Sequence, residues 1–174
     1  MNSTVYIALS IIIALITFAI VISRINRNKK EKENKKLAAE FDYFAIKNNL
    51  AIDKKQTLNK NMIGIDRLNL KLVFLDNSNN ARERFHLIEL NDLSACHLIK
   101  QKNSSTGHIS KILLKCIFIQ KNRAPIELLF YDEMKDDIFK MMRLSKKALY
   151  WEKNINIFRE IAELSTGSLA SARD

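Results

Sequence analysis

The chain has 174 residues and a formal net charge of +10, from 29 basic and 19 acidic side chains. Its three glycines and one proline exclude collagen-like and most low-complexity classes, and its 47% of apolar residues is enough for one packed domain. Two cysteines, Cys96 and Cys116, do not make a disulfide framework, so we expect both to be small core residues.

The first feature along the chain is an uncharged apolar run from Val5 to Ile22, in which only Ser10 and Thr17 are polar. As a helix, this run would rise about 27 Å, which is close to the hydrocarbon thickness of a bilayer. A cleaved signal peptide would need a basic start and a small-residue exit, and the run has neither. A buried core helix would be expected to have a polar face. The sequence therefore predicts that residues 1–23 are a transmembrane anchor.

A basic cluster follows this run and predicts how the chain is oriented. Residues 24–36 carry a net charge of +5, which is half of the total. Because basic flanks stay in the cytoplasm, we expect a single pass through the cell (inner) membrane, with the N-terminus outside and the rest of the chain in the cytoplasm. The cluster is also expected to contact the lipid bilayer, and it lacks the aromatic residues of a nucleic-acid arm. The predicted membrane-surface residues are Arg24, Arg27, Lys29, Lys30, Lys32, Lys35 and Lys36.

Residues 24–60 are expected to connect the anchor to a folded domain. Apolar side chains recur at helical spacing from Leu37 to Ala45, which predicts a short amphipathic helix from about Lys35 to Asn49. This helix either packs on the domain or lies on the membrane surface. The segment from Lys54 to Asn61 is polar and predicts a loop.

Residues 61–165 are expected to form one α+β domain that begins with an antiparallel sheet. From Met62 onward the apolar residues alternate with a period of two, and short polar turns separate the runs. Consecutive short strands with brief turns are typical of a meander or a partly open barrel of about six strands. The predicted strands cover residues 62–65, 70–74, 84–90, 93–100, 109–120 and 126–131.

A C-terminal amphipathic helix is predicted to cover this sheet. Six apolar residues from Leu144 to Ala162 follow one another at spacings of three and four and so form one stripe, with Trp151 as its structural anchor. The run Thr166-Gly167-Ser168 is expected to stop the helix, and residues 166–174 to form a flexible tail.

A β meander capped by a helix with tryptophan on its inner face resembles the pleckstrin-homology-like (PH-like) superfamily. It looks most like the small bacterial membrane-anchored members. The resemblance is carried by the strand series 62–131, the turn from Leu90 to Leu93, and Ala148 and Trp151 in the final helix. It implies a binding module. Members that bind phosphoinositides have clustered basic residues in the first hairpin, and this chain has only Arg67 and Lys71 there, so inositide binding is not implied.

The chain has no sequence motif for catalysis or for a cofactor. Its glycines are isolated, which excludes a glycine-rich phosphate loop, and it lacks the HExxH, CxxC and nucleophile-elbow patterns. An acidic patch near the last strand is expected to be solvated surface, since acid–base catalysis needs a cleft. The patch consists of Glu127, Asp132, Glu133, Asp136 and Asp137.

One arrangement of histidine and cysteine could suggest a metal. In a tight hairpin centred on Asn91, His86 would lie opposite Cys96 and close to His97. Neighbouring residues of a strand point to opposite faces, however, and a zinc site needs about four ligands. We therefore expect no metal, no cofactor and no enzymatic activity.

The main functional hypothesis is a single-pass, membrane-anchored, non-enzymatic binding or scaffold protein. Its cytoplasmic PH-like domain would present a sheet edge or an open barrel end to a protein or lipid partner. The basic composition gives one alternative, a membrane-tethered nucleic-acid-binding protein, although a charge of +5 outside the cluster is ordinary. An enzyme with an unrecognised site is the other alternative.

Overall fold

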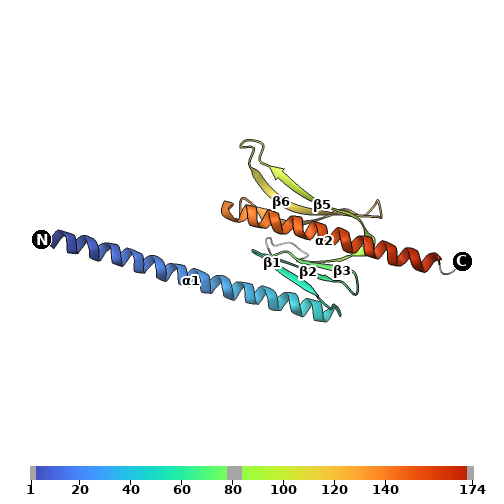
Figure 1. Ribbon diagram of the computed structural model, residues 1–174, viewed down its shortest axis with the longest axis horizontal. Coiled ribbons are helices and arrows are strands. Elements are labelled where there is room, and N and C mark those ends of the chain that lie inside the picture. Colours follow the sequence, from blue (N-terminus) through green and yellow to red (C-terminus); the bar gives the residue numbers. More distant parts are fainter. Residues whose placement is uncertain (1–2, 78–83, 172–174) are drawn as a thin grey trace. The chain divides into compact units, whose positions relative to one another are not determined.

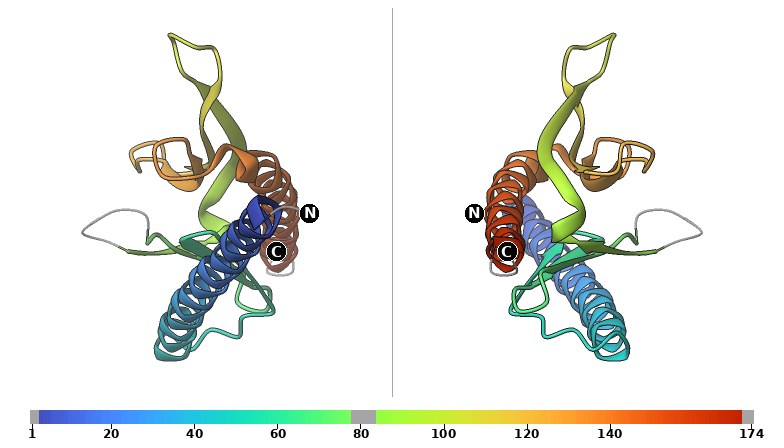
Figure 2. Two further views of the ribbon diagram at one scale, coloured as in Figure 1. Left: turned by 90° about the vertical axis from the view of Figure 1, so that its left-hand side faces the viewer. Right: turned by 90° about the vertical axis from the view of Figure 1, so that its right-hand side faces the viewer.

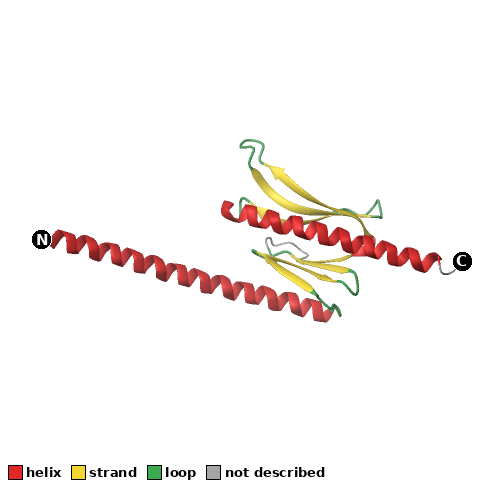
Figure 3. Cartoon of the chain, in the orientation of Figure 1, coloured by secondary structure: helices red, strands yellow, loops and turns green. Residues whose placement is uncertain are grey.

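The computed structural model describes residues 3–77 and 84–171, with side chains for residues 15–77 and 84–164. In these residues the chain forms two long helices and seven strands, and the strands make two antiparallel sheets (Figures 1 and 3). This is the predicted α+β class. The chain divides into two compact units whose boundary lies between Ala39 and Glu40. The elements are α1 (Ser3–Lys47), β1 (Lys54–Leu58), β2 (Asn61–Asp66), β3 (Lys71–Leu75), β4 (Phe85–Glu89), the 3₁₀ turn η1 (Leu90–Asp92), β5 (Leu93–Lys102), β6 (Ile109–Phe118), β7 (Ile126–Asp132) and α2 (Ile138–Ser171).

Helix α1 is continuous through the predicted anchor, connector and short helix. No glycine or proline occurs in its 45 residues, so nothing in the sequence interrupts the backbone hydrogen bonds. It ends at Lys47, and Asn49 follows in the left-handed conformation with φ of 54°, as is common after a helix. Among the described residues, no helical stretch is both long and apolar enough to cross a membrane. The side chains of residues 5–14, the first part of the predicted anchor, lie outside the described ones.

The last turns of α1, from Glu40 onward, pack on the first sheet. Phe41 is fully buried, and its ring lies so close to Gly64 of β2 that an added Cβ there would be 2.7 Å from ring atom Cζ. Phe44 stacks on Phe85 of β4, with ring centroids 4.1 Å apart. This part of the predicted amphipathic helix therefore packs on the domain, which decides between the two placements for residues 40–47.

The first sheet has the strand order β1-β2-β3-β4. Strand β1 occupies the segment predicted to be a loop, so that prediction is wrong. Its sequence KKQTL has little apolar content, but the whole strand pairs with β2, from Lys54 opposite Ile65 to Leu58 opposite Asn61. Pairing with an already formed strand overrides the weak local preference of polar residues.

The second sheet has the order β5-β6-β7, so the chain changes sheet at η1. The tight hairpin expected around Asn91 is therefore wrong. Strand β4 pairs with β3, and β5 pairs with β6. The change of sheet is fixed because Leu90 and Leu93, at the two ends of the turn, are both fully buried. The six predicted strands are present as β2–β7, but they form two sheets instead of one meander. The β5–β6 hairpin extends away from the other strands (Figure 2).

Helix α2 runs alongside both sheets (Figure 1). Buried residues of its predicted apolar stripe belong to one core cluster with residues of both sheets. Trp151 is fully buried, and its indole Nε1 donates to Gln56 Oε1 of β1 at 2.9 Å. On the other side, Asn156 donates to the carbonyl of Cys96 in β5 at 2.9 Å. The helix continues through Thr166-Gly167-Ser168 to Ser171, so the predicted stop is wrong. A single glycine inside a helix costs only about 1 kcal/mol, which the rest of the helix tolerates.

A buried carboxylate holds the connection between α1 and the first sheet. Asp66, which ends β2, has no exposed surface. It accepts hydrogen bonds from the backbone N–H of Ala51 at 2.8 Å and from the backbone and side chain of Asn69 at 2.9 and 2.7 Å. Burial alone would raise the pKa of Asp66, but these hydrogen bonds together lower it below its ordinary value of 3.8.

Asp66 is predicted to stabilise the fold at neutral pH and to lose this effect in acid. Because its folded pKa is lowered, its contribution is present above about pH 3.8 and disappears as the pH falls through the folded pKa. Asp66→Asn should lower the free energy of unfolding by about 1–3 kcal/mol at neutral pH and flatten this acid dependence. Urea unfolding at several pH values measures both effects. Asp42→Asn is the matched control, since Asp42 is an exposed partner of Lys55; an equal loss in the control would contradict the assignment.

Candidate functional site

The predicted membrane-surface residues all lie on one helix. The seven basic side chains between Arg24 and Lys36 are exposed on α1. One of them, Lys35, forms an ion pair of 3.1 Å with Glu31 one turn earlier. An exposed pair of this kind contributes little stability, so these side chains remain available to a charged surface.

The histidines and cysteines are not brought together as a metal site would require. His86 faces Phe74 across the β3–β4 ladder, and His97 lies opposite Lys115. Cys96 instead lies opposite Cys116, with the two sulfur atoms 3.9 Å apart. The hydrogen bond between these thiols and their burial raise the pKa of Cys96, which disfavours a reactive thiolate. Within residues 3–77 and 84–171, no three potential ligands lie close enough to hold a metal ion.

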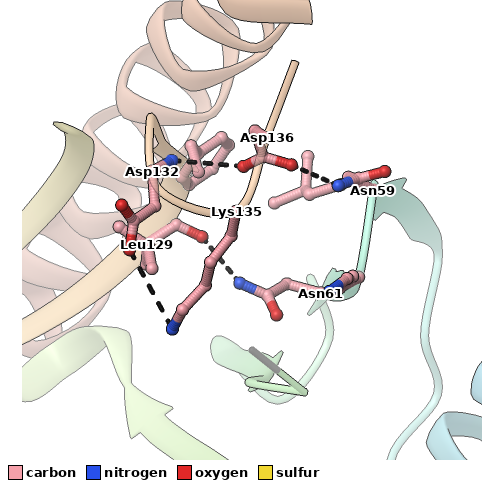
Figure 4. Close-up of a pocket in the computed structure, with 9 residues that line it drawn as sticks. Asn59, Asn61, Leu129, Asp132, Lys135 and Asp136 are labelled. Atoms are coloured by element: carbon pink, nitrogen blue, oxygen red, sulfur yellow. Dashed lines mark hydrogen bonds and ion pairs between the residues drawn. The ribbon is translucent and has the colours of Figure 1, made fainter. Parts of the chain in front are cut away.

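A polar cluster joins the β1–β2 turn to the segment that follows β7 (Figure 4). Asn59 donates to the carboxylate of Asp136, whose second oxygen accepts from the backbone N–H of Asp132 at 3.1 Å. Asn61 donates to the carbonyl of Leu129 at 2.8 Å. The cavity between these groups has about 10 Å³, which is space for one water molecule at most. This cluster therefore fixes the position of the β7–α2 connection and has no room for a ligand.

A larger groove lies on the other side of this connection. It has a volume of about 650 Å³, which is within the range of ligand sites. One wall is the β5–β6 loop with Ile109, and the other is the connection from β7 into α2. We call it the link groove. Three large apolar side chains line it, Met134 of the connection and Ile138 and Met141 at the start of α2.

Polar and acidic side chains also line the link groove. Tyr131 is one of them and is 2% exposed. Burial raises the pKa of Tyr131 first, and the negative charges of Glu133, Asp136 and Asp132 raise it further. Asn103 donates to one carboxylate oxygen of Glu133 at 3.2 Å, which holds Glu133 at the groove. Two residues of the acidic patch that the sequence predicts as solvated surface, Glu133 and Asp136, therefore line a groove.

Large apolar side chains stand exposed around the groove. Phe139 is 89% exposed and Met134 is 85% exposed, although hydrophobic side chains of this size are usually buried. Ile138 and Met142 are also exposed, and we call the four residues the groove rim. Met134 and Ile138 line the groove, and Phe139 and Met142 belong to the first turns of α2 next to them in sequence. The sequence contained the signal, since these residues do not belong to the inner stripe of α2. The signal was missed because the predicted strands end at residue 131 and the predicted apolar stripe begins at Leu144, so residues 132–142 were assigned to neither.

No protein-family model matches the chain, and neither a curated protein nor a solved structure matches it. The fold and the groove describe the class of protein. It is an α+β domain of two antiparallel sheets between an N-terminal and a C-terminal helix, with an open groove at the start of the C-terminal helix.

Proposed function

We propose that the protein is a single-pass, membrane-anchored, non-enzymatic binding or scaffold protein, whose cytoplasmic PH-like domain presents the link groove to a partner. The observation that carries this proposal is the open groove with its rim of exposed apolar side chains. Contiguous exposed apolar surface on a small domain is typical of an interaction site.

The sequence before the domain supports the anchor and its orientation. Residues 5–22 contain no charged side chain, and the basic cluster follows on one flank only. The exposure of that cluster on α1 suits contact with anionic headgroups, where each Lys or Arg contributes about 1 kcal/mol.

The order of elements supports a PH-like domain. Two antiparallel sheets are followed by a C-terminal helix, and Trp151 points from this helix into the core. Of the features on which the resemblance rests, the series of antiparallel strands and the tryptophan of the final helix are present, whereas the strands form two sheets instead of one meander. The apolar walls of the groove also support a role in binding a partner.

The proposed topology predicts where a single exposed thiol becomes labelled. Cys96 and Cys116 are fully buried, so the wild-type chain should give almost no reaction with a maleimide that cannot cross membranes. Met134→Cys places a thiol at an 85% exposed position of the domain. This variant should be labelled only after the cells are permeabilised, whereas Asn2→Cys, outside the membrane in this topology, should be labelled in intact cells. Labelling of Met134→Cys in intact cells would contradict the topology.

The proposed binding surface predicts crosslinks at specific positions. A photoreactive phenylalanine analogue at Phe139, which is 89% exposed, should crosslink the full chain to a partner in cell membranes. Leu68 is the matched control because it is 82% exposed and belongs to the β2–β3 turn, which does not line the groove. Equal crosslinking at the two positions, or none at Phe139, would contradict the groove as the binding site.

A further inference from the structure

The link groove includes the tyrosine of the last strand. Tyr131 is buried on β7 as a residue and is one of the side chains that line the groove. A phenolic hydroxyl can both donate and accept a hydrogen bond. The groove therefore combines a neutral hydrogen-bonding side chain with the carboxylate of Glu133, which also lines it.

The negative charges near the Tyr131 hydroxyl favour a positively charged ligand. The carboxylate of Glu133 lies at the groove and accepts from the neutral amide of Asn103, and no basic side chain among the described residues forms an ion pair with it. Asp136 also lines the groove, and its hydrogen bonds come from the neutral donors Asn59 and the backbone of Asp132. This local negative charge stands out on a chain with a net charge of +10.

The apolar walls of the groove favour a ligand that also has an apolar group next to its positive charge. Met134 and Met141 line it, and methionine adapts its shape to different partners. The apolar surface then continues beyond the groove to Phe139 and Met142, which are 89% and 68% exposed. A small amine would leave this outer surface uncovered, whereas a peptide segment would cover both the groove and its rim.

We infer that the link groove binds a basic, apolar segment of a partner protein, with a Lys or Arg side chain between Glu133 and the Tyr131 hydroxyl and an adjacent apolar side chain against Met134, Ile138 and Met141. The inference rests on the proposed function and names the chemistry of its partner. A charge-assisted hydrogen bond to Glu133 positions the cation, and the apolar walls supply the buried area.

The test is a fluorescence-anisotropy titration of the full chain in a nonionic detergent with labelled model peptides. A peptide of alternating lysine and leucine should bind, and its binding should weaken as ionic strength rises. Matched peptides of glutamate with leucine and of lysine with serine should not bind. Binding of the cationic peptide is not a general charge effect, because the chain as a whole repels it.

Variants locate the binding. Glu133→Gln keeps an acceptor for Asn103 and should weaken binding about tenfold, and Tyr131→Phe should weaken it about threefold. Glu127→Gln makes the same charge change at an exposed position of β7 that does not line the groove, and it should leave binding unchanged. Equal losses in Glu133→Gln and Glu127→Gln would overturn the inference.

Two further outcomes separate the inference from the function on which it rests. If Phe139 crosslinks to a cellular protein and the lysine–leucine peptide does not compete, the binding function stands and the inferred chemistry is wrong. If nanodiscs with phosphatidylglycerol protect residues 131–142 from hydrogen exchange and the peptide does not, the groove binds the bilayer, which also overturns the inference.

Discussion

The domain depends on one helix that closes two open sheet edges. Strand β1 is an edge of the first sheet and β5 is an edge of the second, and α2 reaches both. Asn156 bonds to both the N–H and the carbonyl of Cys96, at 3.1 and 2.9 Å, in the manner of a neighbouring strand. On the other edge, Lys147 donates to the carbonyl of Thr57 at 2.7 Å. Open edges attract further strands, so these side-chain bonds both join the sheets and protect them.

The same closure explains where the groove lies. Helix α2 follows directly after the last strand, so the short connection between them must turn at the end of the second sheet. The cluster of Asn59, Asn61 and Asp136 ties that connection to the β1–β2 turn. Asp136 and Asn59 fix the connection on the side of the β1–β2 turn. The apolar side chain of the connection, Met134, lines the link groove together with Tyr131.

Much of the fold follows from periodicity, because burial on one face leaves a clear pattern. The alternation in β6 and the stripe through Trp151 predicted a strand and a helix that the structure contains. Strand β1 was missed because its edge position requires no apolar face. The change of sheet at η1 was missed because the same short turn also suits a hairpin, and only the burial of Leu90 and Leu93 against both sheets decides between them.

The site could be predicted only in its parts. The sequence revealed the acidic residues around Glu133, but periodicity gives no reason for a groove beside them. Exposed methionine and isoleucine outside a stripe look like irregularities until the fold places Met134 and Ile138 in one groove with Tyr131. A groove formed by a loop from one hairpin and a connection some 25 residues later depends on tertiary structure, which local patterns do not contain.

The most direct test of the helix as the closing element is the substitution Asn156→Leu, because this side chain makes both hydrogen bonds to Cys96. Asn154→Leu is the matched control, since the hydrogen bond that Asn154 makes among the described residues goes to the carbonyl of Tyr150 in its own helix. Asn156→Leu should lower the free energy of unfolding by about 1–3 kcal/mol and speed hydrogen exchange at Cys96, while the control should change stability by less than about 0.5 kcal/mol. Equal stability of the two variants, with unchanged exchange in β5, would contradict the closure of the sheet edge by α2.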